Sequence, residues 1–168
     1  MNIKKIISLL ITMVLLMAVP FASFAEEDED YCCDESAFVW MTSEEVSAEL
    51  LSRGIGFDKI VLYSVGAISD RDITVTPERD QNRIEVFFYT TASMVANEIG
   101  IKSLKFYENG ILLKTNTKIY TGFKSKYTNG YYYYAPVSGR KYNATGTNFA
   151  LFTNTEVALF TESDTITY

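Results

Sequence analysis

The sequence contains no histidine, and its two cysteines are adjacent. Histidine is the commonest general base near neutral pH and the commonest neutral metal ligand, so its absence argues against most hydrolase mechanisms and most zinc sites. Phosphate-binding loops of the P-loop type and nucleophile-elbow motifs are also missing from the sequence. These absences favour a protein that is not an enzyme and that needs no cofactor or bound metal.

Basic residues are outnumbered by acidic ones. Removing Lys4 and Lys5, which fall in a predicted signal peptide, from the 15 Lys and Arg leaves 13 against 21 Asp and Glu. The remaining chain therefore carries a net charge of about eight negative. Such a surface repels phosphate backbones and anionic lipids, so neither nucleic acid nor a membrane is an expected partner.

Residues 1–25 have the three parts of a secretory signal peptide. Lys4 and Lys5 form the positive n-region, and an apolar h-region runs over residues 6–19. Small residues up to Ala25, followed by acids, predict cleavage after Ala25. The apolar run of about 14 residues is too short for a spanning helix of about 20, and no second run of that length follows. We expect secretion, with no membrane attachment once the signal is removed.

Residues 26–40 are expected to form an acidic, flexible leader. Cys32 and Cys33 lie in it and have no other cysteine with which to pair. Adjacent cysteines close on each other only as a strained ring, because one peptide bond holds their Cα atoms closer than a relaxed disulfide requires. A redox-sensitive ring, a soft-metal site, an intermolecular disulfide and an incidental pair all remain open.

One helix is predicted near the start of the folded region, over about 43–53. Thr42 and Glu45 form a capping box, Met41 precedes them as a hydrophobic staple, and Gly54 marks the C-terminal end. The apolar face that packs on a sheet consists of Val46, Leu50 and Leu51.

The rest of the chain alternates β-branched and aromatic runs with turn residues, which is typical of strands. The predicted strands are 59–65, 72–76, 83–89, 102–108, 111–120, 130–137, 147–153 and 156–161. Asn-Gly pairs at 109–110 and 129–130 predict tight hairpin turns. Strand 83–89 is apolar on both alternating faces and is expected to be central. Residues 41–168 are therefore expected to form a single, mainly all-β domain, an immunoglobulin-like antiparallel β-sandwich of two packed sheets with one short N-terminal helix.

Residues 90–101 carry a resemblance to a known group of proteins. The segment begins with Thr91-Ala92, continues with Val95-Ala96 and ends in Ile99-Gly100-Ile101 ahead of an alternating strand. It resembles small secreted proteins of Gram-positive bacteria, of unknown function, with an immunoglobulin-like or fibronectin-like sandwich. The resemblance covers roughly residues 72–168. It implies that 90–101 forms a helical turn that crosses between the sheets, and it implies no particular activity.

Tyrosines are the candidate ligand-binding residues. They are Tyr131, Tyr132, Tyr133, Tyr134 and Tyr142. Alternation along a strand sends Tyr131 and Tyr133 to one face and their neighbours to the other, so one pair is expected in the core and the other at the surface. Exposed tyrosines offer rigid contact area for sugars or a protein partner. Ordinary cross-strand aromatic packing is the alternative interpretation.

The leading hypothesis is a secreted, non-enzymatic binding module that recognises an extracellular protein or glycan. The alternative is a structural or assembly protein of the cell envelope or extracellular matrix, joined through edge strands or through Cys32 and Cys33. A small hydrolase that uses carboxylates such as Glu156 and Glu162 is a third possibility, and it requires that the acids converge. The sequence leaves the ligand and the oligomeric state open.

Overall fold

The structure is a computed structural model that describes residues 35–55 and 66–168. All of these residues belong to one compact unit of the chain. The predicted signal peptide, Cys32, Cys33 and the predicted strand at 59–65 lie outside the described residues. Within the described residues, no helix is long and apolar enough to cross a membrane.

The described residues form seven strands, one α-helix and two short 3-10 helices. The strands are β1 (Phe38–Trp40), β2 (Ile68–Glu78), β3 (Arg83–Glu108), β4 (Ile111–Tyr133), β5 (Lys141–Phe152), β6 (Thr155–Glu162) and β7 (Ile166–Thr167). The helices are η1 (Glu35–Ala37), α2 (Ser43–Ser52) and η2 (Arg79–Gln81).

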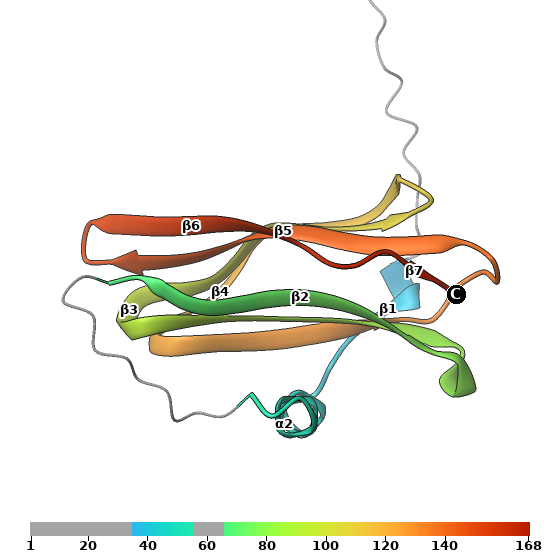
Figure 1. Ribbon diagram of the computed structural model, residues 1–168, viewed down its shortest axis with the longest axis horizontal. Coiled ribbons are helices and arrows are strands. Elements are labelled where there is room, and N and C mark those ends of the chain that lie inside the picture. Colours follow the sequence, from blue (N-terminus) through green and yellow to red (C-terminus); the bar gives the residue numbers. More distant parts are fainter. Residues whose placement is uncertain (1–34, 56–65) are drawn as a thin grey trace, which may run out of the picture. The chain divides into compact units, whose positions relative to one another are not determined.

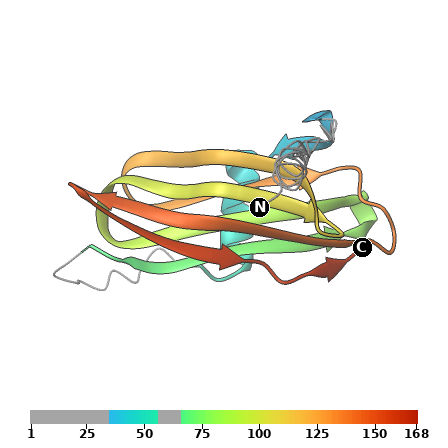
Figure 2. The same cartoon turned by 90° about the horizontal axis from the view of Figure 1, so that it is seen from above.

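The seven strands form one antiparallel sheet that folds over into two layers (Figures 1 and 2). The long strands β3 and β4 enter both layers: residues 84–91 of β3 pair with 126–133 of β4, and residues 96–108 pair with 111–124. The first pair, with β1 and β2, makes the layer against which α2 lies, the helix-side layer. The second pair, with β5, β6 and β7, makes the far layer. The predicted all-β, sandwich-like fold with one short helix is confirmed, but its layers are continuous rather than two separate sheets.

The bend of β3 falls in the segment 90–101, which is extended rather than the helical turn that the resemblance implies. The pairing of β3 with β4 skips from Thr91 to Ala96, so the intervening residues form a bulge that turns the strand. Buried Ala92, Ala96 and Ala150 meet at this bend. Their small side chains let the two layers approach, so no helix is needed to cross between them.

The predicted strand 111–120 and residues 130–133 of the predicted strand 130–137 belong to one strand, β4, which ends at Tyr133. The predicted turn at 129–130 is therefore wrong. Gly130 pairs with Phe87 inside the helix-side layer. A side chain at Gly130 would collide with Met41 Sδ, and the Met41 N–H donates to the Gly130 carbonyl at 2.9 Å. This glycine therefore permits close packing rather than a turn. The other predicted Asn-Gly turn is confirmed, since Asn109 and Gly110 have φ values of 49° and 83°.

The described end of the predicted flexible leader is ordered. Phe38, Val39 and Trp40 pair with Tyr133, Tyr132 and Tyr131 as β1. The Phe38 ring packs against Phe106 and Tyr133, with centroids 6.2 and 4.9 Å apart. Apolar contact of this kind outweighs the entropy of a flexible chain, so the leader prediction fails for residues 35–40.

Helix α2 has the ends that the sequence predicts. Thr42 and Glu45 form the capping box. At the other end, Gly54 has φ +63°, and N–H groups of Gly54 and Ile55 donate to carbonyls of Leu51 and Leu50, both at 3.1 Å. Leu50 is buried against the sheet, but the side chain of Leu51 is 78% exposed. The predicted apolar face is therefore narrower than expected.

Strand β3 separates two apolar clusters, as a central strand should. Ile84, Val86 and Phe88 face the core between the layers. The side chains of Phe87 and Tyr89 point the other way and pack with residues at and before α2. The helix-side layer is therefore covered on one face by the far layer and on the other by the helix.

Candidate functional site

A cleft of about 270 Å³ opens beside β2, where β2 faces the end of β6 and the chain that leads to β7. We call it the β2 cleft. Its lining residues are Arg53, Asp72, Ile73, Thr74, Val75, Thr76, Glu162, Ser163 and Asp164. A side-chain contact lies on each side of the stretch 72–76. Before it, Arg71 Nε donates to Thr161 Oγ1 at 3.2 Å, and after it, Arg79 donates to the Thr167 carbonyl at 3.1 Å.

The backbone of β2 forms one wall of this cleft. Five consecutive residues, 72–76, line it, and β2 pairs with β3 on its other side. No second described strand pairs with β2. A strand paired on one side leaves alternate N–H and C=O groups available on the other, so β2 presents an edge without a partner strand to the cleft. Within this edge, the Ile73 N–H donates to Asp72 Oδ1 at 2.9 Å.

The charge of the cleft is negative. Three carboxylates line it, from Asp72, Glu162 and Asp164, against one guanidinium, from Arg53. Desolvation by the surrounding residues raises the pKa of Asp72. A partly buried carboxylate is costly to ionise without a partner, and a cationic ligand beside it lowers that cost. The cleft therefore favours positively charged groups.

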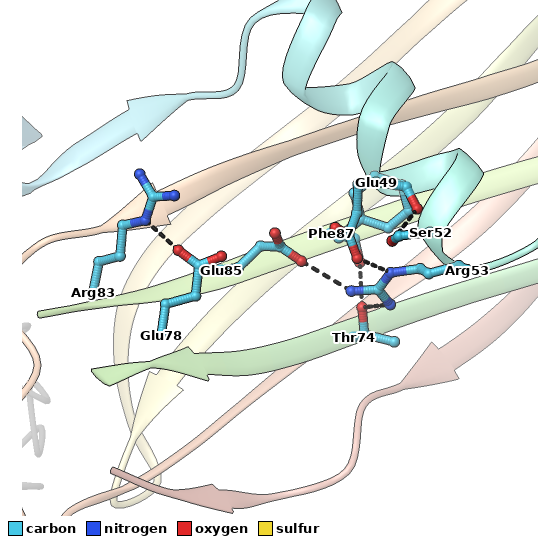
Figure 3. A network of polar contacts seen from close by, with 8 residues as sticks. All are labelled: Glu49, Ser52, Arg53, Thr74, Glu78, Arg83, Glu85 and Phe87. Carbon is cyan, nitrogen blue, oxygen red and sulfur yellow. Dashed lines mark hydrogen bonds and ion pairs between the residues drawn. The ribbon is translucent and has the colours of Figure 1, made fainter. Parts of the chain in front are cut away.

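Arg53 offsets only part of the negative charge of the cleft, because its guanidinium also pairs with carboxylates outside the cleft (Figure 3). It donates to Glu49 on α2, to Thr74 Oγ1 on β2 at 2.6 Å and to Glu85 on β3 at 2.9 Å. Its guanidinium also lies over the Phe87 ring, 4.8 Å from the centroid. One side chain thus joins the end of α2 to two strands.

Glu85 is the buried member of this network. Its side chain is only 4% exposed, and burial raises its pKa to about 7, with the nearby Glu49 charge adding to the effect. Arg53 opposes this shift, but its single charge is shared between two carboxylates. The carboxyl of Glu85 therefore titrates near neutral pH.

The structure buries four of the five candidate tyrosines. Tyr131, Tyr133 and Tyr142 lie in the core between the layers, so the part of the prediction that places one alternating pair in the core is confirmed for Tyr131 and Tyr133. The Tyr142 hydroxyl donates to Glu108 Oε2 at 2.7 Å and accepts from the Val137 N–H at 2.8 Å. These three rings are structural and do not reach a surface ligand.

Tyr132 and Tyr134, the pair expected at the surface, do not form an exposed binding surface. Tyr132 is buried with Met41 and Leu50 beneath α2, because the helix covers the face that the sequence suggested would be exposed. Tyr134 is 41% exposed, but its hydroxyl accepts a hydrogen bond from Arg83 at 2.9 Å. The Arg83 guanidinium lies 3.5 Å from the Tyr132 ring centroid. The expected exposed pair is therefore reduced to Tyr134 alone.

The two carboxylates considered for hydrolysis do not meet. Glu156 and Glu162 lie at opposite ends of β6, and Glu156 forms an ion pair with Lys102. Six residues along a strand separate their Cα atoms by about 20 Å. The described residues also hold no cluster of three or more metal-ligating side chains.

Sequence reasoning missed Arg53, Asp72 and Glu85. Glu85 offered a signal, since it is a charge between the apolar residues Ile84 and Val86 of a strand expected to be central. A charged residue in such a strand needs a buried partner. Nothing in the sequence identified that partner as Arg53, which lies 32 residues earlier in the chain.

No protein-family model, no curated protein and no solved structure matches this chain.

Proposed function

We propose that this protein is a secreted, non-enzymatic binding module that captures an extended, basic segment of another extracellular protein along β2. The observation that carries the proposal is that three carboxylates line the β2 cleft beside a strand edge with which no second described strand pairs. A peptide added beside β2 gains main-chain hydrogen bonds from the edge. Its lysine or arginine side chains gain from Asp72, Glu162 and Asp164.

A protein segment fits this cleft better than a glycan does. No aromatic ring is among the described residues that line it, so a sugar has no stacking surface there. The strand edge instead offers alternating donors and acceptors at the spacing of an extended peptide.

The test is a fluorescence-anisotropy titration of the purified protein with a labelled peptide in which lysine alternates with valine. We expect saturable binding that weakens about tenfold or more when Asp72 and Asp164 are both changed to Asn. The matched control is Asp80→Asn, in η2 and outside the cleft, which should bind as the unchanged protein does. The same peptide with glutamate in place of lysine should not bind.

Equal binding by the unchanged protein and the Asp72→Asn, Asp164→Asn variant would reject the cleft as the site. Absence of peptide binding, together with capture by cell-wall polysaccharide, would assign the module to glycans instead. A second candidate function, assembly of the protein with itself, rests on the two edge strands of the far layer, β4 and β6. Of these, β6 also contributes Glu162 to the β2 cleft.

A further inference from the structure

Neither edge strand of the far layer pairs with a further strand in the part of the chain that the structure describes, and at its end β6 faces β2, where Arg71 Nε donates to Thr161 Oγ1 at 3.2 Å. The strand order there is β4-β3-β5-β6, so β4 forms one edge and β6 the other. Residues 111–124 of β4 pair with β3, and β6 pairs with β5; no further described strand adds to either. Each edge therefore presents backbone groups to which another strand can pair.

The two edges carry opposite charges. From Ile111 to Lys124, the part of β4 in the far layer contains three lysines and no acid. These are Lys114, Lys118 and Lys124. From Thr155 to Asp164, β6 and the residues after it contain three acids and no base. These are Glu156, Glu162 and Asp164.

This pattern differs from one that only prevents aggregation. Charges on an edge strand commonly block pairing, and the same sign on both edges makes every edge-to-edge contact repulsive. Opposite signs repel β4 from β4 and β6 from β6, but they attract β4 to β6. We infer that copies of this protein assemble head to tail, with β6 of one copy pairing with β4 of the next.

The strand directions fit this pairing. Each neighbouring pair in the far layer is antiparallel, so β6 runs opposite to β4 of its own copy. A second copy placed beside the first without being turned over brings its β4 antiparallel to the first copy's β6. The four-strand repeat then continues the alternation of the sheet from copy to copy.

Ion pairs already cross the strands of this layer within one copy. Glu98 on β3 pairs with Lys118 on β4, and Lys102 on β3 pairs with Glu156 on β6. The contact between copies places lysines of β4 beside acids of β6 and extends the same alternation of charges. Because such an interface joins two different surfaces, it generates an open-ended chain of copies, and the twist of the sheet makes that chain helical.

The first test is sedimentation velocity of the purified protein with reductant present, so that disulfides through Cys32 or Cys33 play no part. At low ionic strength we expect a continuous series of species whose mean mass rises with protein concentration. Salt at about 1 M shortens the range of the ionic attraction to about 3 Å and should return the protein to single copies. Single copies at all concentrations, or a closed dimer that grows no further, would overturn the inference.

The second test uses matched charge reversals on the two edges. One variant carries Lys118→Glu and Lys124→Glu, and the other carries Glu156→Lys and Glu162→Lys. In each variant alone, the two edges carry net charges of the same sign, because the first variant keeps only Lys114 against two new acids on β4, and the second keeps only Asp164 against two new lysines on β6. Each variant alone should therefore sediment as single copies, whereas an equimolar mixture should regain the high-mass species. Circular dichroism and thermal unfolding of each variant check that it is folded. A mixture of folded variants that stays single-copy, or unimpaired assembly of either variant alone, would contradict the pairing.

This inference does not depend on the proposed function of the β2 cleft. The Asp72→Asn, Asp164→Asn variant loses Asp164 of the β6 edge but retains Glu156, Glu162 and the three far-layer lysines of β4. It should lose peptide binding and still assemble, which separates failure of one proposal from failure of the other.

Discussion

Tyr131 and Tyr142 pack their rings against the same side chain, Phe106, at centroid distances of 6.3 and 5.8 Å, but their hydroxyls have opposite surroundings. The Tyr142 hydroxyl bonds to Glu108 and Val137. The Tyr131 hydroxyl is buried without a hydrogen-bond partner among the described residues. Burial also raises the pKa of Tyr131, so the ring stays neutral. The same substitution at the two positions should therefore change stability in opposite directions.

Tyr131→Phe should stabilise the protein by about 1 kcal/mol, since it removes an unsatisfied buried hydroxyl and keeps the ring. Tyr142→Phe should destabilise it by about 2 kcal/mol, because the buried Glu108 carboxyl loses its Tyr142 donor and keeps Arg140, and the Val137 N–H loses the hydroxyl that accepts from it. Urea unfolding at pH 7 measures both. Destabilisation by Tyr131→Phe would mean that its hydroxyl has a partner that the described residues do not supply.

Removal of Arg53 should loosen α2 from the sheet. Arg53→Ala leaves the buried Glu85 carboxylate unpaired, and we expect a loss of about 3 kcal/mol in the free energy of unfolding. Adding Glu85→Gln to that variant should restore part of the loss, because no buried charge then lacks a partner. Urea unfolding of the two single variants and the double variant gives the coupling energy. Additive effects would show that the pair does not interact.

Stability should fall as the pH rises through the range in which Glu85 titrates. Its pKa is raised from an ordinary 4.5 to about 7 in the folded protein, so the folded state holds a proton that the unfolded chain has released. The favourable contribution is complete below pH 4.5 and is lost as the pH rises to about 7, by about 3 kcal/mol at most. Urea unfolding midpoints at pH 5 and pH 8 measure the loss.

Glu85→Gln should flatten this pH dependence, whereas Glu35→Gln, at an exposed position, should leave it unchanged. Equal slopes for Glu85→Gln and the unchanged protein would show that other groups cause the dependence.

Gly100 marks a close approach of backbones. A side chain there would collide with the Ile119 carbonyl, and Tyr120 and Phe149 flank the position with ring centroids 6.4 Å apart. We expect Gly100→Ala to cost about 3 kcal/mol or to prevent folding. Gly122→Ala is the matched control in the next strand, where the added methyl group would meet only a carbonyl at 3.3 Å. Thermal unfolding compares the two, and equal effects would refute the close approach.

Local signals in the sequence predicted local structure well. Thr42, Glu45 and Gly54 act within a few residues of each other, so the ends of α2 are set by nearby groups. Asn109-Gly110 forms the turn that joins β3 to β4 for the same reason. The strand 83–89 carries apolar residues on both of its alternating faces, which the sequence alone shows. The structure buries both faces of this part of β3.

The predictions that failed depend on distant contacts. Gly130 follows Asn129, and an Asn-Gly pair is typical of a turn. In the structure, however, Met41 from another part of the chain packs over Gly130. Tyr132 is buried by a helix whose position on the sheet no local pattern encodes. The acids of the β2 cleft come from β2 and from the end of β6, segments about 90 residues apart that the fold of the sheet brings together.

The shared use of β3 and β4 by both layers has a consequence for how the chain folds. Their pairing begins beside the two-residue turn at Asn109-Gly110 and extends outward to Ile84 and Tyr133. Closing this hairpin at its turn costs little loop entropy, and each further pair adds to an existing ladder. The hairpin is therefore the expected folding nucleus for both layers, and neither layer should unfold while the other persists.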